Sequence, residues 1–213
     1  MLISSILKDL GYDPQLDTFI QSHDLAEFEI GRIIRESKKK YMVKTQGGNY
    51  HGQISGKLRH EAKSRSDYPA VGDWVAIKPM EKDQAIIHEI LPRKTIIERQ
   101  AIGRFGKKQT IAANVDVAFV MQDITHDFNL NRLDRLIAIG FASKIHPVVI
   151  LTKIDLAEIS ELADKTAQIK KRFAEVPILF LSNKSMEGFP AVQKLIEYGK
   201  TYCFIATQSP TAG

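Results

Sequence analysis

The sequence predicts two architectures in one chain, a small β-barrel of the OB type in the first half and a parallel α/β sheet in the second. Five or so short strand patterns lie within about 70 residues, between positions 28 and 97, which is typical of a small closed barrel. From residue 114 onward strand and helix patterns alternate, which implies parallel strands joined by helical crossovers. Charge divides in the same way. Residues 31–110 hold 18 Lys and Arg against 8 acids, whereas residues 111–213 hold 11 of each.

These patterns divide the chain into four predicted parts. Residues 1–26 form a helical or irregular lead-in, with apolar residues at helical spacing and Gly11 as a stop signal. Residues 27–98 form the barrel, residues 99–112 a basic linker, and residues 113–213 the α/β part. The total length of 213 residues and the 44% hydrophobic content fit an ordinary globular protein of one large or two small domains.

The predicted barrel strands are short apolar runs bounded by turn residues. They are Phe28–Arg35, Tyr41–Thr45, Tyr50–Ile54, Pro69–Ile77, Ala85–Leu91 and Thr95–Ile97. Residues 46–49 read Gln-Gly-Gly-Asn and are a hairpin signal, whereas residues 56–70 are polar and basic with no clear period. Tyr41, Tyr50, His51 and Trp74 are of the types that stack on nucleic-acid bases, but such aromatics are more often core residues, and for Trp74 we favour the core.

The charge of the barrel region favours a nucleic-acid partner. A net charge of +10 over residues 31–110 marks a surface that neutralises phosphates and releases counterions. The alternative is a solvated surface with lysine in excess. Barrels of this type bind single-stranded or structured RNA on one face and its loops. The candidate RNA-binding residues are Lys38, Lys39, Lys40, Lys57, Arg59 and Arg65.

The second half of the chain repeats a strand–helix rhythm. The predicted strands are Val115–Met121, Pro147–Leu151, Val176–Leu181 and Tyr202–Ile205, and the predicted helices are Leu130–Phe141, 157–173 and Phe189–Tyr198. The run Pro147–Leu151 is apolar throughout, as expected of a strand that is buried on both faces. Ligands of α/β proteins bind beyond the carboxyl ends of such strands.

Directly after that strand stands Thr152-Lys153-Ile154-Asp155, an arrangement that can recognise guanine. The Asp155 carboxylate can accept hydrogen bonds from the ring N–H and the exocyclic amine, a pair that adenine does not offer. Lys153 can lay its aliphatic stem along the base with its ammonium near phosphate and ribose oxygens, and Thr152 can hold the loop. The alternative is a strand end with a charged pair, where Asp155 caps the next helix.

Composition excludes several other classes of protein. The single cysteine, Cys203, rules out an internal disulfide framework, suits the cytosol and is expected to be a buried thiol. The one cysteine and the six histidines do not have the spacing of metal ligands, so no metal site is predicted. No apolar stretch approaches the ~18 residues of a membrane span, and the N-terminus lacks the basic region of a signal peptide. We therefore expect a cytoplasmic protein without a membrane partner.

Further motifs produce a family resemblance. About 30 residues beyond Asp155, again at a predicted strand end, Leu181-Ser182-Asn183-Lys184 resembles the second guanine-contacting loop of G proteins. Residues 71–75 (Val-Gly-Asp-Trp-Val), 114–116 (Asn-Val-Asp), 128–135 (Phe-Asn-Leu-Asn-Arg-Leu-Asp-Arg) and 199–205 complete the pattern. From residue 26 to 206 the chain strongly resembles the RsgA (YjeQ/YloQ) family, circularly permuted GTPases of small ribosomal subunit maturation.

The resemblance implies a fold, an activity and partners. It makes residues 113–213 the N-terminal half of a circularly permuted P-loop G domain, and it places Ser182, Asn183 and Lys184 beside the base. It implies binding of GTP or GDP, GTP hydrolysis stimulated by the small ribosomal subunit, and contacts of the barrel with 16S rRNA. G-protein sheets have the strand order 2-3-1-4-5-6, so the four strands here are expected to form the contiguous block 1-4-5-6.

The expected phosphate loop is not found in the 213 residues. Neither Gly106-Lys107 nor Gly199-Lys200-Thr201 fits the Walker pattern, and the family's loop would follow Ile205, where this chain has residues 206–213. The family's Mg and Zn sites and both switch regions would lie beyond that point, so the catalytic residues are unknown. We therefore expect weak nucleotide binding and deficient hydrolysis. The alternative function is an rRNA-binding barrel with a vestigial nucleotide domain and no catalysis.

Overall fold

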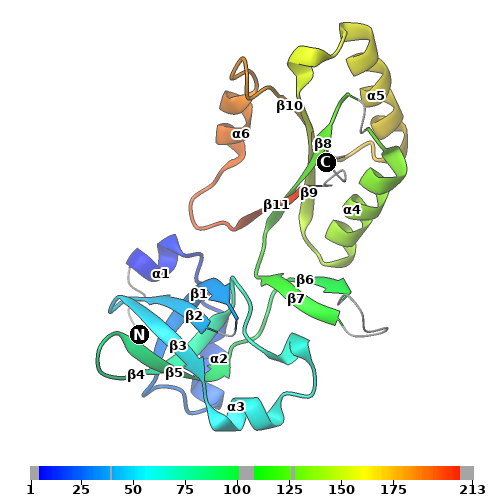
Figure 1. The fold of residues 1–213 in the computed structure, drawn as a ribbon. Helices are drawn as coiled ribbons and strands as arrows, with labels where there is room; N and C mark the ends of the chain where they lie inside the picture. The colour runs from blue at the N-terminus through cyan, green and yellow to red at the C-terminus, as the bar shows by residue number, and fades with distance from the viewer. Residues whose placement is uncertain (1–4, 39, 101–107, 126–127, 207–213) are drawn as a thin grey trace. The chain divides into compact units, whose positions relative to one another are not determined.

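The computed structural model describes residues 5–38, 40–100, 108–125 and 128–206. It divides into two compact units, Met1–Val115 and Asp116–Gly213, and each is described here by itself. Figure 1 shows the barrel of the first unit and the sheet of the second. The two units contain the two architectures that the sequence predicts.

The first unit is built on a closed five-stranded barrel with the strand order β1-β2-β3-β5-β4. Its strands are β1 (Glu29–Ser37), β2 (Lys40–Thr45), β3 (Asn49–Ile54), β4 (Trp74–Pro79) and β5 (Gln84–Ile90). Neighbouring strands are antiparallel except β3 and β5, which are parallel. The predicted OB-like barrel is confirmed. Its interior is apolar and is filled by side chains such as Val43, Val75 and Ile87, each fully buried.

Strand β4 is buried on both faces, and this explains the environment of the lone tryptophan. Val75 and Ile77 belong to the barrel interior, whereas Trp74 and Ala76 pack in a second cluster. This alternation follows from the two-residue period of a strand. The second cluster also holds apolar residues of α1 (Ser5–Asp9) and α2 (Leu16–Ser22), which cover this side of the barrel. With 2% of its surface exposed, Trp74 is a core residue, as we favoured from the sequence.

The segment without a clear period, residues 56–70, contains a short helix that the sequence did not predict. Helix α3 (Gly56–Glu61) begins where the Ser55 side chain accepts a hydrogen bond from the Leu58 N–H at 3.1 Å. The 3-10 helix η1 (Arg65–Asp67) follows and is held by a capping box between Ser64 and Asp67. Both are stabilised by local caps, which satisfy N–H groups at a helix start and do not require an amphipathic repeat.

The predicted sixth barrel strand and basic linker fold differently. Strand β6 (Ile96–Gln100) does not join the barrel but pairs with β7 (Lys108–Ala113) in a separate antiparallel sheet. The part of the predicted linker that the structure describes is therefore largely strand. The hairpin is anchored at its base, where the Thr95 hydroxyl donates to the Val115 carbonyl at 2.7 Å.

The second unit contains a four-stranded parallel sheet with the order β10-β9-β8-β11. Its strands are β8 (Val117–Asp123), β9 (His146–Thr152), β10 (Ile178–Leu181) and β11 (Tyr202–Ala206). When the strands are numbered as in a G protein, this order is 6-5-4-1. The contiguous block that the resemblance implied is therefore present. Strand β11 forms one edge, and Phe204 on it is 64% exposed.

Helices cover both faces of this sheet (Figure 1). On one face lie α4 (Leu130–Ala142) and α5 (Ile159–Arg172), which bury Leu133, Ile137 and Ile169 against the strands. On the other face lies α6 (Phe189–Leu195), where Val192 packs with Phe119 and other strand residues. Because the four strands are parallel, they all end at the same edge of the sheet. The loops at this carboxyl edge carry the polar motifs of the sequence.

Candidate guanine-recognition site and RNA-binding surface

At the carboxyl edge of the sheet, the structure brings Asp155 and Ser182 together. The two residues are 27 positions apart, and the Ser182 hydroxyl donates to Asp155 Oδ1 at 2.6 Å. Ser182 is fully buried just after β10, whereas Asp155 is exposed in the 3-10 helix η2 (Ile154–Leu156) that follows β9. The contact fixes one carboxylate oxygen and leaves the other available to a ligand.

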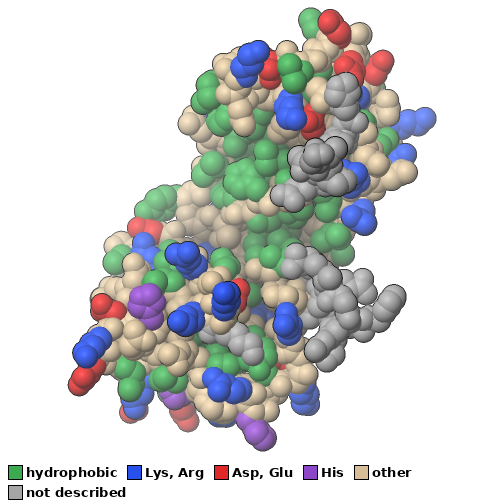
Figure 2. All heavy atoms as spheres, viewed as in Figure 1, with side chains coloured by type: hydrophobic (Ala, Val, Ile, Leu, Met, Phe, Trp, Pro, Cys, Tyr) green, Lys and Arg blue, Asp and Glu red, His purple; other side chains and the backbone are tan. Residues whose placement is uncertain are grey.

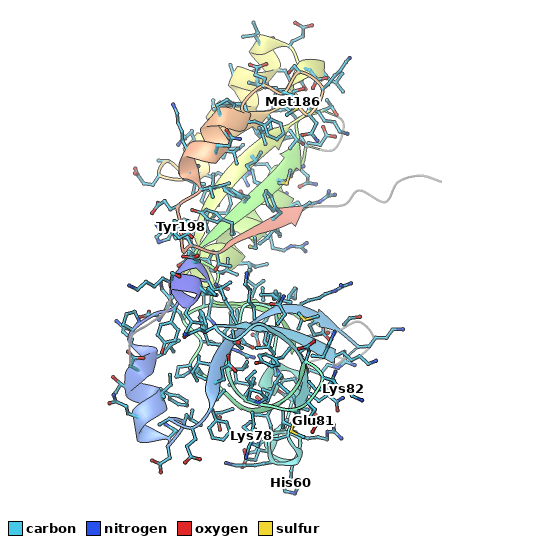
Figure 3. All side chains as sticks on the ribbon, turned by 90° about the vertical axis from the view of Figure 1, so that its left-hand side faces the viewer. His60, Lys78, Glu81, Lys82, Met186 and Tyr198 are labelled. Atoms are coloured by element: carbon cyan, nitrogen blue, oxygen red, sulfur yellow. The ribbon has the colours of Figure 1, made fainter. Side chains whose placement is uncertain are left out.

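Ser182 also organises the loop that follows β10. Its hydroxyl accepts the Lys184 N–H at 3.2 Å and the Ser185 N–H at 3.1 Å, and its own N–H donates to the Glu187 carbonyl at 3.1 Å. The loop carries Met186, labelled in Figure 3, and ends at Gly188, the N-cap of α6. The three hydrogen bonds between this buried serine and backbone groups of Lys184, Ser185 and Glu187 make the loop a preorganised structure.

Gly188 is required by the geometry of the same loop. Its φ of +83° is in the left-handed region, and a Cβ at this position would lie 1.7 Å from the Phe180 carbonyl oxygen. Only glycine avoids both the backbone strain and the clash. The fold of the loop, and with it the position of Ser182, therefore depends on a residue outside the predicted motif.

Lys153 is held by a partner that the sequence analysis did not identify. Its ammonium lies 2.5 Å from Asp123 Oδ2, at the end of β8. The other oxygen, Asp123 Oδ1, accepts the Thr125 N–H at 2.8 Å and the Thr125 hydroxyl at 2.7 Å. Burial alone would raise the pKa of Asp123, but the bonds from Lys153 and Thr125 outweigh it and hold this pKa below its usual value. The available signal was an acidic residue at the end of the preceding strand, since strand ends meet at one edge.

The backbone around Lys153 explains how the side chains are presented. Lys153 has a φ of +60°, a left-handed conformation that turns the chain sharply out of β9 and into η2. Thr152 stands just before this turn, and its carbonyl accepts the Ile124 N–H at 3.1 Å. The Lys153 side chain is 59% exposed and leaves its stem open to solvent. The predicted loop residues Thr152, Lys153 and Asp155 thus belong to one rigid turn.

The arrangement provides acceptors and donors in the pattern that a guanine requires. Asp155 offers a carboxylate oxygen, and Asn183 and Lys184 are exposed on the neighbouring loop. Among the described residues, the Asn183 N–H donates to no protein acceptor, so it can face a carbonyl group of a ligand. A carboxylate and a backbone donor held on two adjacent strand ends can contact opposite sides of one purine edge. The residues present therefore fit the base of a guanine nucleotide.

In the first unit, the predicted RNA-binding residues are at the surface. Lys38 lies in the turn between β1 and β2, Lys40 begins β2, and the remaining three are Lys57 and Arg59 in α3 and Arg65 in η1. All five are exposed, and Lys39 lies outside the described residues. Figure 2 shows several Lys and Arg side chains gathered on one face of this unit. The structure does bring Lys38 and Arg65 to the rim of one cleft.

Over residues 5–38, 40–100, 108–125 and 128–206, no group of three or more His, Cys, Asp or Glu is placed to hold a metal ion. In the same part of the chain, no helix is long and apolar enough to cross a membrane.

Comparison with known proteins identifies the family. The family model described as RsgA GTPase matches residues 90–209, which is more than half of the chain. The chain belongs to the RsgA GTPase family. The predicted resemblance is thereby confirmed, and the match begins near the end of the barrel and continues through all four strands of the sheet.

Curated members of the RsgA family support the assignment. The "Small ribosomal subunit biogenesis GTPase RsgA 2" of Lactiplantibacillus plantarum is 35% identical over 178 residues, covering 84% of this chain and 50% of that protein. The "Small ribosomal subunit biogenesis GTPase RsgA" of Opitutus terrae is 30% identical over 210 residues, covering 94% of this chain and 57% of that protein. The chain thus spans about half the length of these relatives.

Solved structures of RsgA relatives share the fold. The crystal structure of YjeQ from Thermotoga maritima has a TM-score of 0.67 at 19% identity, covering 85% of this chain and 61% of that one. The structure of YloQ, described as a circularly permuted GTPase, has a TM-score of 0.63 at 21% identity, covering 88% and 62%. This likeness confirms the predicted barrel and permuted α/β architecture.

Proposed function

We propose that the second unit recognises the base of a guanine nucleotide, as part of the machinery of a small ribosomal subunit biogenesis GTPase. The observation that carries this proposal is the 2.6 Å contact between Ser182 and Asp155. It orients the carboxylate so that Oδ2 and the second lone pair of Oδ1 can accept from the ring N–H and the exocyclic amine of guanine. Polar groups paired in this way reject ligands that lack the complementary groups.

The remaining loop residues have supporting roles in this proposal. Thr152 holds the end of β9, and the exposed stem of Lys153 covers one face of the base while Asp123 restrains its ammonium. The Asn183 N–H donates to the base carbonyl, and Lys184 lies beside it in the loop that Ser182 organises. Ser182 holds the Asp155 carboxylate and Asp123 restrains the Lys153 ammonium before a ligand binds, which reduces the ordering needed on binding.

We expect a polypeptide limited to these 213 residues to hydrolyse GTP negligibly. Phosphoryl transfer depends on groups that position and neutralise the phosphates. The one Gly-Lys-Thr run in the described residues, Gly199-Lys200-Thr201, precedes β11, and its residues have other partners: Lys200 pairs with Glu197, and the Thr201 N–H bonds Asp116. Mg²⁺ would neutralise phosphate charge in such a reaction. Single-turnover hydrolysis as fast as that of the longer relatives would contradict this expectation.

For the first unit, we propose that the basic barrel binds rRNA of the small ribosomal subunit. The support is the +10 charge of residues 31–110 together with the exposed positions of the predicted basic residues. Binding through phosphates should weaken steeply with salt, because each contact releases counterions. The alternative function, RNA binding without any nucleotide recognition, would show the same salt dependence but no response to guanine nucleotides.

Charge reversal tests this surface. Lys38, Lys39 and Lys40 changed together to Glu should weaken co-sedimentation with the small subunit by about 10- to 100-fold and flatten its salt dependence, because up to three phosphate contacts are lost. The matched control reverses three exposed lysines of the second unit, Lys144, Lys171 and Lys194, with the same change in net charge. If the control variant binds the small subunit as weakly as the Lys38, Lys39 and Lys40 variant, or if both bind as tightly as the wild-type chain, the RNA surface is not at residues 38–40.

A further inference from the structure

The first unit contains a cleft of about 430 Å³ whose apolar walls are explained neither by the nucleotide motifs nor by the candidate RNA-binding residues. It forms where the end of β1, the start of β2, the loop before β4 and strand β7 meet. The β6–β7 hairpin is attached here to the barrel. The Ala113 N–H donates to the Val71 carbonyl at 2.9 Å, and the Ser66 hydroxyl donates to Glu98 at 3.0 Å. The cleft is therefore made within one compact unit.

Apolar and aromatic side chains form the walls of the cleft. Tyr68 lines it and packs against the barrel core, whereas Val71 and Ile111 are 38% and 48% exposed. Tyr41, 3% exposed, closes the inner end. Burial, with a smaller contribution from the negative charge of Glu36, raises the pKa of Tyr41 to about 12, so its phenol stays protonated. A flat aromatic ligand would find the ring of Tyr68 and aliphatic surface of Val71 and Ile111 to pack against.

Polar groups converge on the same cleft. Gln109 offers an amide with both a donor and an acceptor, and Arg65 lies 3.4 Å from it, between Nη1 and Oε1. Thr110 also lines the cleft, but its hydroxyl is shielded from solvent and is not presented to a ligand. Lys38 and Arg65 add two exposed cations at the rim.

We propose that this cleft binds a single unpaired nucleotide of an RNA strand, with its base between the aromatic and aliphatic walls and its phosphate against Lys38 and Arg65. The inference rests on the proposed RNA-binding function of the barrel and adds a site that reads an unstacked base. RNA is recognised mainly through unstacked bases, which stack on aromatic side chains and bond through their edges. The Gln109 amide supplies the edge contact.

Size and charge favour this ligand over others. The volume lies at the lower end of the range for small-ligand sites and suits one nucleotide. Two exposed cations, Lys38 and Arg65, outnumber the one exposed carboxylate, Glu36, and the Gln109 amide lies beside the apolar walls. This arrangement matches a ligand with a charged backbone and an aromatic head. A free mononucleotide has the same chemistry, so the experiment separates the two sources.

The test compares two RNA hairpins that differ only in one bulged adenosine, which the second, fully paired hairpin lacks. The wild-type chain should bind the bulged hairpin about 5- to 100-fold more tightly, since one base stacked on aromatic residues contributes an effect of this size. Val71→Trp, which fills the cleft, and Gln109→Ala, which removes the edge contact, should each bring the preference close to one. Both should leave the affinity for the paired hairpin within about twofold, because that affinity comes from phosphate contacts.

Gln53→Ala, at an exposed barrel position away from the cleft, is the control and should keep the preference. Thermal unfolding of every variant checks the fold. If Val71→Trp does not fold, Gln109→Ala alone tests the site. Equal binding of both hairpins by the wild-type chain, or a preference that survives in both variants, overturns the site while leaving RNA binding intact. Failure to bind either hairpin overturns the proposed RNA function as well. Micromolar binding of free AMP without a preference for the bulge would overturn an RNA strand as the ligand.

Discussion

Replacing Asp155 with asparagine is expected to reverse the base preference of the second unit from guanine to xanthine. The carboxylate accepts from both the ring N–H and the exocyclic amine of guanine. The asparagine amide keeps one acceptor, but it turns a donor toward the amine. Xanthine has a carbonyl where guanine has the amine, so it restores the match. Since an unmatched polar contact costs about 1–3 kcal/mol, we expect GDP binding to fall by about 10- to 100-fold while XDP binding rises.

The measurement is a nucleotide titration of the 213-residue chain followed by the amide signals of Asn183 and Lys184. Base contacts alone provide only a few kcal/mol, so dissociation constants of about 1 mM are expected. Asp164→Asn, an equal charge change at an exposed position on α5, is the control and should leave both affinities unchanged. Asp155→Asn should retain the bond from Ser182, because the amide oxygen still accepts it. If the ratio of GDP to XDP affinity does not change in this variant, Asp155 does not read the base.

The second sheet was predictable in detail because its strands are continuous apolar runs. A strand buried on both faces needs apolar residues at every position, and Val148 to Leu151 form such a run. The order of the strands did not come from the residues but from the resemblance to G proteins. Asp155 and Ser182 lie at the ends of adjacent parallel strands, β9 and β10, so their meeting followed once the order was known.

The elements that escaped prediction are held by contacts between distant residues or by local caps. Helix α3 depends on the Ser55 cap, and six residues are too few to show a helical period. The β6–β7 hairpin has the composition of a basic loop, and its attachment to the barrel involves Val71 and Ser66. Asp123 is 30 positions from Lys153, and the two are linked only when the ends of β8 and β9 are known to be adjacent. Such pairings are properties of the tertiary fold, which the linear sequence of one protein does not display.

Replacing Arg93 with methionine is expected to destabilise the first unit by about 3–5 kcal/mol, the largest single effect that we predict. Arg93 makes two 2.7 Å bonds to the carboxylate of Asp73, which is fully buried. It also donates to the carbonyls of Ser66 at 2.7 Å and Tyr68 at 2.8 Å, and so fixes the loop before β4. Methionine fills part of the volume but leaves the buried Asp73 charge without its hydrogen-bonded cation, since Arg32 acts on Asp73 only through its charge.

The pH dependence of this loss distinguishes an uncompensated charge from lost packing. Burial already raises the pKa of Asp73 above its ordinary value of 3.8, and Arg93 opposes that shift. Without Arg93 the folded-state pKa rises further above the unfolded value. The proton is then bound more tightly in the folded state, so stability is retained below about pH 4 and is lost as the pH rises through the folded-state pKa. The deficit of Arg93→Met should therefore be small in acid and full at pH 7.

Trp74 makes the measurement specific, because it is the one tryptophan of the chain and is buried in the first unit. Its fluorescence during denaturant unfolding reports on that unit even if the second unit unfolds separately. Arg59→Met, at an exposed position on α3, should change stability by less than about 0.5 kcal/mol. Adding Asp73→Asn to Arg93→Met should recover part of the loss, because the stranded charge is removed. A deficit that is the same at pH 4 and pH 7, and that the double variant does not reduce, would show that Arg93 acts through packing and its carbonyl bonds alone.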